Sequence, residues 1–177
     1  MEPFANLRDG GVQLASELLS APLLADAYAM TLAPIMPNGV PVTLGMIDGL
    51  ASRTSLRMRI EPLDVIRSGD GIQIGAVPAI VDDLVVVVDD GVETGTAALA
   101  SGRALRDVLT PNEKGRRPAL LLAVPVCPHQ ALPDLLGIFD AVIAVHRPLA
   151  RRSLSWHYVD FDVIDEARAR ELLGRAP

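Results

Sequence analysis

Cysteine is almost absent from this sequence, since Cys127 is the single cysteine among 177 residues. One cysteine excludes an internal disulfide and a zinc site built from several cysteines. The three histidines, His129, His146 and His157, show no metal-ligand spacing. Aromatic residues form only 3% of the chain, so we expect a core of leucine, valine, isoleucine and alanine.

The chain also lacks long hydrophobic runs and an excess of positive charge. No apolar run approaches the roughly 18 to 20 residues that a membrane-spanning helix needs, and the first residues contain no apolar signal-peptide region. The formal net charge of −6 disfavours duplex nucleic acid as the main partner, because that partner needs a basic surface. We therefore expect a cytoplasmic protein without a membrane or nucleic-acid partner, folded as a single domain over residues 1–177.

Apolar patterns along the chain predict strands that alternate with helices. The segments with strand character are 27–35, 55–61, 84–89, 119–126 and 141–148. The segments with helical spacing are 8–20, 40–52, 96–109, 129–139 and 165–175. This order predicts an α/β fold of three layers, with a mainly parallel central sheet and helices on both faces.

Two segments are less regular. Residues 62–83 are expected to form an irregular loop with a strand or two around Ile72 to Ile80, and 156–161 an extended piece. Ligands of parallel sheets bind beyond the carboxyl ends of the strands, so the loops after residues 35, 89 and 126 are the places to search.

The strongest chemical signal is the segment VVVVDDGVETGTA, residues 85–97, in which a buried strand, two acids and a glycine-containing turn precede a helix. A helix start exposes unpaired N–H groups and a partial positive charge, which suits a phosphate, and Gly95 permits close approach to the backbone. Thr94 and Thr96 can add hydroxyl hydrogen bonds. The carboxylates of Asp89 and Asp90 can accept hydrogen bonds from sugar hydroxyls or organise water around Mg²⁺. The loop therefore predicts a sugar-phosphate site.

This segment resembles the phosphoribosyl-diphosphate (PRPP) signature of the type I phosphoribosyltransferases: four apolar residues, two acids, three further residues, then Thr-Gly-Thr. The resemblance implies that Asp89 and Asp90 hold the ribose hydroxyls and Mg²⁺, and that residues from Glu93 to Ala97 wrap the 5′-phosphate. Asp90 and Glu93 are the implied catalytic residues. The implied ligand-binding residues of the loop are Asp89, Asp90, Gly91, Val92, Glu93, Thr94, Gly95, Thr96 and Ala97.

Shorter pieces elsewhere are similar to the uncharacterised bacterial proteins that contain a phosphoribosyltransferase domain. These pieces are residues 8–11, 38–42, 74–77, 123–126 and 158–161. The resemblance implies a type I phosphoribosyltransferase-like fold with a small hood made by the terminal segments. It also implies PRPP and an unidentified nitrogenous base as substrates, pyrophosphate as a product and Mg²⁺ as the cofactor. Dimerisation is common in the family, and a homodimer is compatible with the sequence, although no feature of it demands one.

Two departures from the family pattern bear on turnover. Relatives carry Pro-Arg-Gly-Gly in the first loop, whereas this chain has no cation there, so Asn38 and Gly39 would bind pyrophosphate through backbone N–H groups. Relatives also have a long mobile lid before the signature strand, and here only residues 62–83 fill that place, so a lid would be short or missing. Two functions stay open: a Mg²⁺-dependent phosphoribosyltransferase, which we favour, and a catalytically degenerate module that binds PRPP or a nucleotide.

Several residues near the predicted site have two interpretations. Glu93 either faces the nucleobase as a base, as an acid does in the hypoxanthine-guanine branch, or is a solvated loop acid. Trp156 and Tyr158 either stack on the base or cover the sheet. A small basic cluster either contacts an anion or is solvated surface: Arg147, Arg151 and Arg152.

Overall fold

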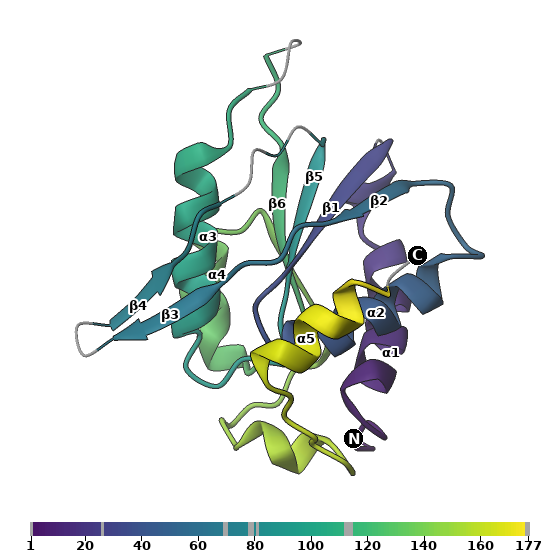
Figure 1. The fold of residues 1–177 in the computed structure, drawn as a ribbon, viewed down its shortest axis with the longest axis vertical. Helices are drawn as coiled ribbons and strands as arrows, with labels where there is room; N and C mark the ends of the chain where they lie inside the picture. The colour runs from purple at the N-terminus through teal and green to yellow at the C-terminus, as the bar shows by residue number, and fades with distance from the viewer. Residues whose placement is uncertain are drawn as a thin grey trace.

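Five parallel strands form a central sheet in the order β2-β1-β5-β6-β7 (Figure 1). The computed structural model describes residues 2–25, 27–68, 71–77, 80, 82–111 and 115–175. The strands of the sheet are β1 (Ala29–Pro34), β2 (Arg57–Ile60), β5 (Leu84–Val88), β6 (Ala119–Val126) and β7 (Ala141–His146). Because every neighbouring pair is parallel, the carboxyl ends of all five strands lie at the same edge.

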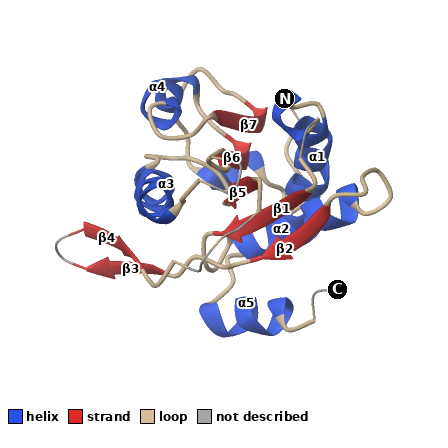
Figure 2. Ribbon diagram, turned by 90° about the horizontal axis from the view of Figure 1, so that it is seen from above, coloured by secondary structure: helices blue, strands red, loops and turns tan. Residues whose placement is uncertain are grey.

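Helices cover both faces of the sheet (Figure 2). One face carries α1 (Leu7–Leu19) and α2 (Gly39–Leu50), and the other carries α3 (Thr96–Val108) and the short α4 (Leu132–Leu136). This arrangement confirms the predicted α/β fold with three layers and a mainly parallel sheet.

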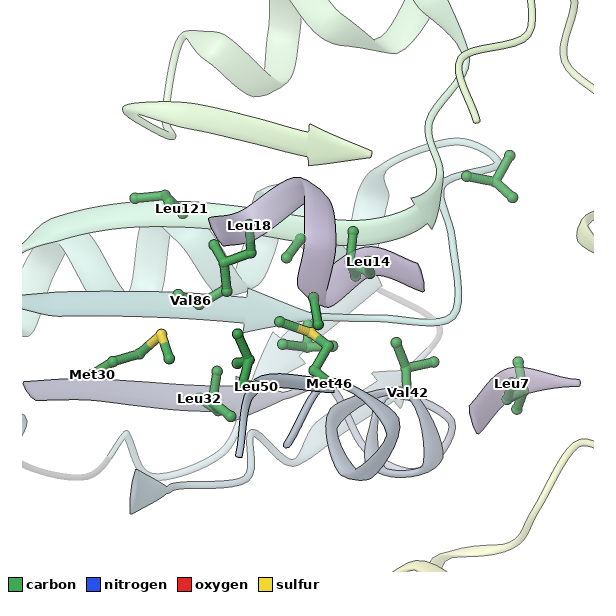
Figure 3. Close-up of a cluster of buried hydrophobic side chains, with 14 of the residues drawn as sticks. Leu7, Leu14, Leu18, Met30, Leu32, Val42, Met46, Leu50, Val86 and Leu121 are labelled. Atoms are coloured by element: carbon green, nitrogen blue, oxygen red, sulfur yellow. The ribbon is translucent and has the colours of Figure 1, made fainter. Parts of the chain in front are cut away.

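Alternating side chains of the buried strands separate two hydrophobic cores. Val86 and Val88 of β5 belong to the core beneath α1 and α2, and Val85 and Val87 belong to the core beneath α3 and α4. Figure 3 shows the first of these cores, in which Met46 of α2 and leucines of α1 meet the sheet. Burial on both faces explains why β5 is an unbroken aliphatic run in the sequence.

Helices α1 and α2 touch through glycines. A Cβ atom added at Gly11 would overlap the backbone carbonyl of Val42, and one added at Gly45 would overlap the backbone carbonyl of Arg8. The two helix backbones therefore approach more closely than any side chain would permit, and glycine is required at both positions.

The segment between β2 and β5 forms an antiparallel hairpin outside the main sheet. Its strands are β3 (Val65–Ser68) and β4 (Gly71–Ile74). The prediction of strand structure near Ile72 is confirmed for β4, but β3 begins earlier than predicted. Within the predicted stretch 62–83, residues 69, 70, 78, 79 and 81 lie outside the described residues. The lid predicted to be short or missing corresponds in position to this short hairpin, which extends away from the sheet (Figure 2).

Two predicted elements are shorter than expected. Residues 129–139 form a 3₁₀ turn, His129–Ala131, and then α4, because Pro133 is accepted only in the first turn of an α-helix. Residues 156–161 are not an extended strand, because their first part belongs to the 3₁₀ helix Leu154–His157. Only Tyr158 forms a bridge, with Phe4 near the other end of the chain.

The last helix, α5 (Glu166–Leu173), packs beside α2. Ala169 of α5 is buried in a small cluster with Met36, Val40 and Leu44. In the described part of the chain, no helix combines the length and the apolar character needed to cross a membrane.

Candidate functional site

A cavity of about 320 Å³ opens at the carboxyl end of β5, where the sheet geometry predicts a ligand site. The residues that line it are Ile72, Asp89, Asp90, Gly91, Val92, Glu93, Thr94, Gly95, Thr96, Ala97, Ala98 and Leu154. All nine loop residues that the sequence singled out, from Asp89 to Ala97, therefore surround one cavity. Ile72 of the hairpin and Leu154 also line the cavity, and neither was predicted.

The N-terminus of α3 forms one wall of this cavity. Gly95 is the N-cap residue and has a φ of +80°, a left-handed conformation that favours glycine. Gly95 has no side chain that could cap the helix, and no acid lies in the first turn. The Thr94 hydroxyl oxygen accepts the N–H of Thr96 at 3.4 Å. The hydroxyls of Thr94 and Thr96 lie 2.9 Å apart at the same end. The first-turn amides, the helix dipole and two hydroxyls thus form a polar, positively polarised wall.

Asp89 and Asp90 have different environments although they are neighbours. The Asp90 carboxylate is buried and accepts a hydrogen bond from Asn38 Nδ2 at 2.9 Å, whereas Asp89 is half-buried. The Asp90 N–H donates to Asp89 Oδ1 at 2.9 Å. Burial raises the pKa of Asp90, and the charge of Glu93 adds to that rise, while the Asn38 and Asp89 hydrogen bonds oppose it. Asp90 is therefore the more buried acid and Asp89 the more accessible one, although both line the cavity.

Asn38 joins three parts of the molecule. Its Nδ2 donates to Asp90, and its Oδ1 accepts the backbone N–H of Ile164 at 3.2 Å. The predicted pyrophosphate contact through backbone N–H groups has no support at Gly39, because its N–H donates to the Ile35 carbonyl at 2.9 Å. Neither residue is among those lining the cavity. Glycine is needed at position 39 because a Cβ there would lie 2.5 Å from the carbonyl oxygen of Val88.

Residues 154–164, called here the C-terminal segment, contact residues 89–97, called here the acidic loop. The Leu154 N–H donates to Glu93 Oε1 at 2.9 Å, and the Tyr158 hydroxyl donates to the backbone carbonyl of Asp90 at 2.5 Å. Glu93 is exposed and lines the cavity, and its Oε1 is bonded to Leu154 in this conformation. These partners are 61 and 68 positions apart in the sequence, and no local sequence pattern could have identified them.

The other residues with two interpretations lie elsewhere. Tyr158 is buried and packs near Phe4 and Phe161, so it covers the core and does not present its ring to a ligand. Trp156 is 71% exposed, outside the cavity, with the Arg152 guanidinium 5.8 Å from its ring centre. Cys127 is buried, and burial raises the pKa of its thiol to about 11, as suits a small apolar core residue.

The donor set near the cavity suits a magnesium ion that arrives with a phosphate ligand. Among the described residues, no group of three or more histidine, cysteine, aspartate or glutamate side chains could hold a metal ion. Mg²⁺ in phosphate-transfer sites takes one or two carboxylates and completes its shell with phosphate oxygens and water. Asp89 and Asp90 provide that number of carboxylates at the cavity.

Comparisons with known proteins agree on the architecture. No protein-family model matches the chain. The structure is similar to that of TT1426 from Thermus thermophilus, with a TM-score of 0.74 and 18% identity over 99% of each chain. The fold is that of the type I phosphoribosyltransferases.

Two enzymes of known activity have this fold. The hypoxanthine-guanine phosphoribosyltransferase (hpt-2) from Bacillus anthracis aligns at 12% identity and a TM-score of 0.52, over 90% of this chain and 79% of that chain. The hypoxanthine phosphoribosyltransferase from Trypanosoma cruzi, solved in complex with the product IMP, aligns at 14% identity and a TM-score of 0.56, over 81% and 77%. At such identities the similarity establishes the fold alone.

Proposed function

We propose that this protein is a phosphoribosyltransferase, which transfers the 5-phosphoribosyl group of PRPP to a nitrogenous base and releases pyrophosphate. The observation that carries the proposal is the N-terminus of α3, whose first turn holds no acid, beside the Asp89–Asp90 pair, around one cavity. These two parts of the site match the two parts of a sugar phosphate. The helix end attracts the phosphate, and the carboxylates accept hydrogen bonds from the sugar hydroxyls.

Different residues of the loop would bind different groups of the substrate. The amides from Glu93 to Ala97 and the two threonine hydroxyls would hold the 5′-phosphate. The more accessible Asp89 would accept hydrogen bonds from the ribose hydroxyls, and Asp90 would hold the turn in place through Asn38. A cavity of about 320 Å³ is at the lower end of the range typical of small-molecule sites.

During transfer, the bond from C1 of ribose to the pyrophosphate oxygen breaks, and a bond from C1 to the base nitrogen forms. Positive charge develops on the ribose ring, and the nearby carboxylates of Asp89 and Asp90 would stabilise it. Bound Mg²⁺, held by the same two aspartates, would supply neutralisation of the leaving pyrophosphate. The base loses a proton, and Glu93 could accept it on its second carboxylate oxygen, because Leu154 bonds only to Oε1.

A second candidate is a catalytically degenerate module that binds PRPP or a nucleotide. Two observations favour it: residues 37–39 contain no cation, and the Gly39 N–H is used internally. Both concern the pyrophosphate half of the site. The two candidates therefore share the ribose-phosphate contacts and differ in turnover.

Calorimetric titration with PRPP and Mg²⁺ tests the proposal. We expect wild-type protein to bind and the Asp89→Asn/Asp90→Asn double variant to lose that binding, because the carboxylate charges are gone while the side-chain shapes remain. Asp107→Asn, which changes an exposed acid of α3 outside the cavity, is the matched control and should bind like wild type. Absence of PRPP binding by wild type would overturn the transferase and the PRPP-binding form of the second candidate.

Turnover then separates the two candidates. Pyrophosphate release should be measured with PRPP, Mg²⁺ and each common purine and pyrimidine base in turn. Release with one base, absent in the double aspartate variant, supports the transferase. PRPP binding without release with any base favours the binding module.

A further inference from the structure

Tyr158 is buried next to the acidic pair, Asp89 and Asp90, and bonds to its backbone. Its hydroxyl donates to the Asp90 carbonyl, while the Asp90 side chain accepts from Asn38 and the Asp90 N–H donates to Asp89. Each polar group of Asp90 thus has its own partner. Burial, together with the charges of Asp90 and Asp89, raises the pKa of Tyr158 far above its ordinary value, so the phenol keeps its proton and remains a donor.

The carbonyl that Tyr158 holds belongs to a peptide with a glycine on its far side. Gly91 has a φ of +152°, and a Cβ there would collide with the Leu154 side chain. The peptide between Asp90 and Gly91 is trans, so its N–H points opposite to its carbonyl. Since a glycine permits more than one orientation of that peptide, the hydrogen bond from Tyr158 selects one, and Asp90 and Gly91 both line the cavity.

Tyr158 is itself firmly placed by the first residues of the chain. The Phe4 N–H donates to the His157 carbonyl at 2.9 Å, and the Val159 N–H donates to the Phe4 carbonyl at 2.7 Å. The Tyr158 ring lies 5.3 Å from the Phe4 ring and 5.2 Å from the Phe161 ring. A residue held at its backbone and its ring has a fixed hydroxyl position.

The phosphate end of the loop is held by other bonds. The Val92 N–H donates to the Val126 carbonyl at 2.9 Å, and Thr94 and Thr96 bond to each other through their hydroxyls. Tyr158 therefore acts on the acidic end of the loop and not on the start of α3.

We propose that Tyr158 is a positioning residue for ribose recognition: it fixes the Asp90–Gly91 peptide and so sets the geometry of the acidic pair, without touching the ligand. This inference rests on the proposed function. It predicts that loss of the hydroxyl weakens binding of the ribose half of the substrate and leaves binding of a phosphate alone unchanged.

The test compares two probes, PRPP with Mg²⁺ and inorganic phosphate, in calorimetric titrations of wild type and Tyr158→Phe. We expect PRPP to bind about tenfold more weakly to Tyr158→Phe, as for loss of one hydrogen bond, with phosphate affinity unchanged. Tyr28→Phe is the matched control, because Tyr28 is 81% exposed and does not line this cavity. Equal weakening of both probes, or of neither, would overturn the inference.

A measurement on the unmutated sequence covers the case in which Tyr158→Phe does not fold. The chain has only two tyrosines, so uniform 3-fluorotyrosine labelling yields two ¹⁹F resonances, with Tyr28 as the exposed reference. PRPP with Mg²⁺ should move the Tyr158 resonance, and inorganic phosphate should not. If the chemical shift of Tyr158 does not change when PRPP binds, the positioning role is overturned. If the wild type does not bind PRPP, the proposed function itself is overturned.

Discussion

Glu93 shows how a residue's chemistry depends on what already occupies its side chain. Its type and place in the loop suggest a proton acceptor, but Oε1 accepts the N–H of Leu154. In this conformation the carboxylate joins the acidic loop to the C-terminal segment. A glutamine could make the same contact, since its amide oxygen is also an acceptor.

Substitutions at Glu93 separate the two roles. If Glu93 joins the loop to Leu154, Glu93→Gln should keep PRPP affinity, and Glu93→Ala should weaken it and lower the free energy of unfolding by about 1 kcal/mol. Calorimetry and urea denaturation measure these effects. If Glu93 is instead the catalytic base, Glu93→Gln should keep its PRPP affinity but no longer release pyrophosphate. That result would contradict a purely structural role for Glu93.

At the scale of elements, the contact between α1 and α2 depends on glycine. Gly45→Ala should destabilise the protein by about 1–3 kcal/mol, because the added methyl overlaps the Arg8 carbonyl and forces the helices apart. Urea denaturation measures the loss. Gly174→Ala is the control, since its added methyl meets only ordinary contacts at 3.6 Å. Equal stability of wild type and Gly45→Ala would mean that the helices separate without cost.

Elements with a strong local pattern were predictable, and those fixed by distant contacts were not. The aliphatic run of β5 and the loop after it identified both the central strand and the cavity wall. Strand β3 was missed because its sequence, VIRS, lacks the alternation of apolar and polar residues that identifies a half-exposed strand such as β2. The partner of Tyr158 was unpredictable for another reason: its contact to Asp90 depends on tertiary packing across 68 positions.

At the scale of the whole molecule, stability should depend on pH through two histidines, the buried His157 and the half-buried His146. His146 stacks on Phe4 with ring centres 4.3 Å apart, and its ring centre lies 6.3 Å from that of His157. The His146 Nδ1 and His157 Nε2 atoms are buried and have no hydrogen-bond partner among the described residues. Burial lowers the pKa of both histidines; the charge of Arg152 adds to the effect on His157, and His157 and the N-terminus add to that on His146.

The direction of this pH dependence follows from which state, folded or unfolded, binds protons more readily. With lowered folded pKa values, the unfolded chain binds protons first, so stability is complete above about pH 6.5 and declines as the pH falls toward the folded values. The slope reaches at most about 1.4 kcal/mol per pH unit for each histidine. Melting temperatures across this range should show the decline. His157→Gln should flatten it, and the exposed His129→Gln should not; an identical slope in both variants would contradict the assignment.

The contacts between the C-terminal segment and the acidic loop also carry a consequence for synthesis. A ribosome makes residues 89–97 long before Leu154, Tyr158 and Ile164, the three partners that hold Glu93, Asp90 and Asn38. A nascent chain that ends before residue 154 can contain the whole acidic loop and the strands of the sheet, yet it lacks all three of those bonds. The proposed recognition of ribose would then require synthesis through at least residue 164.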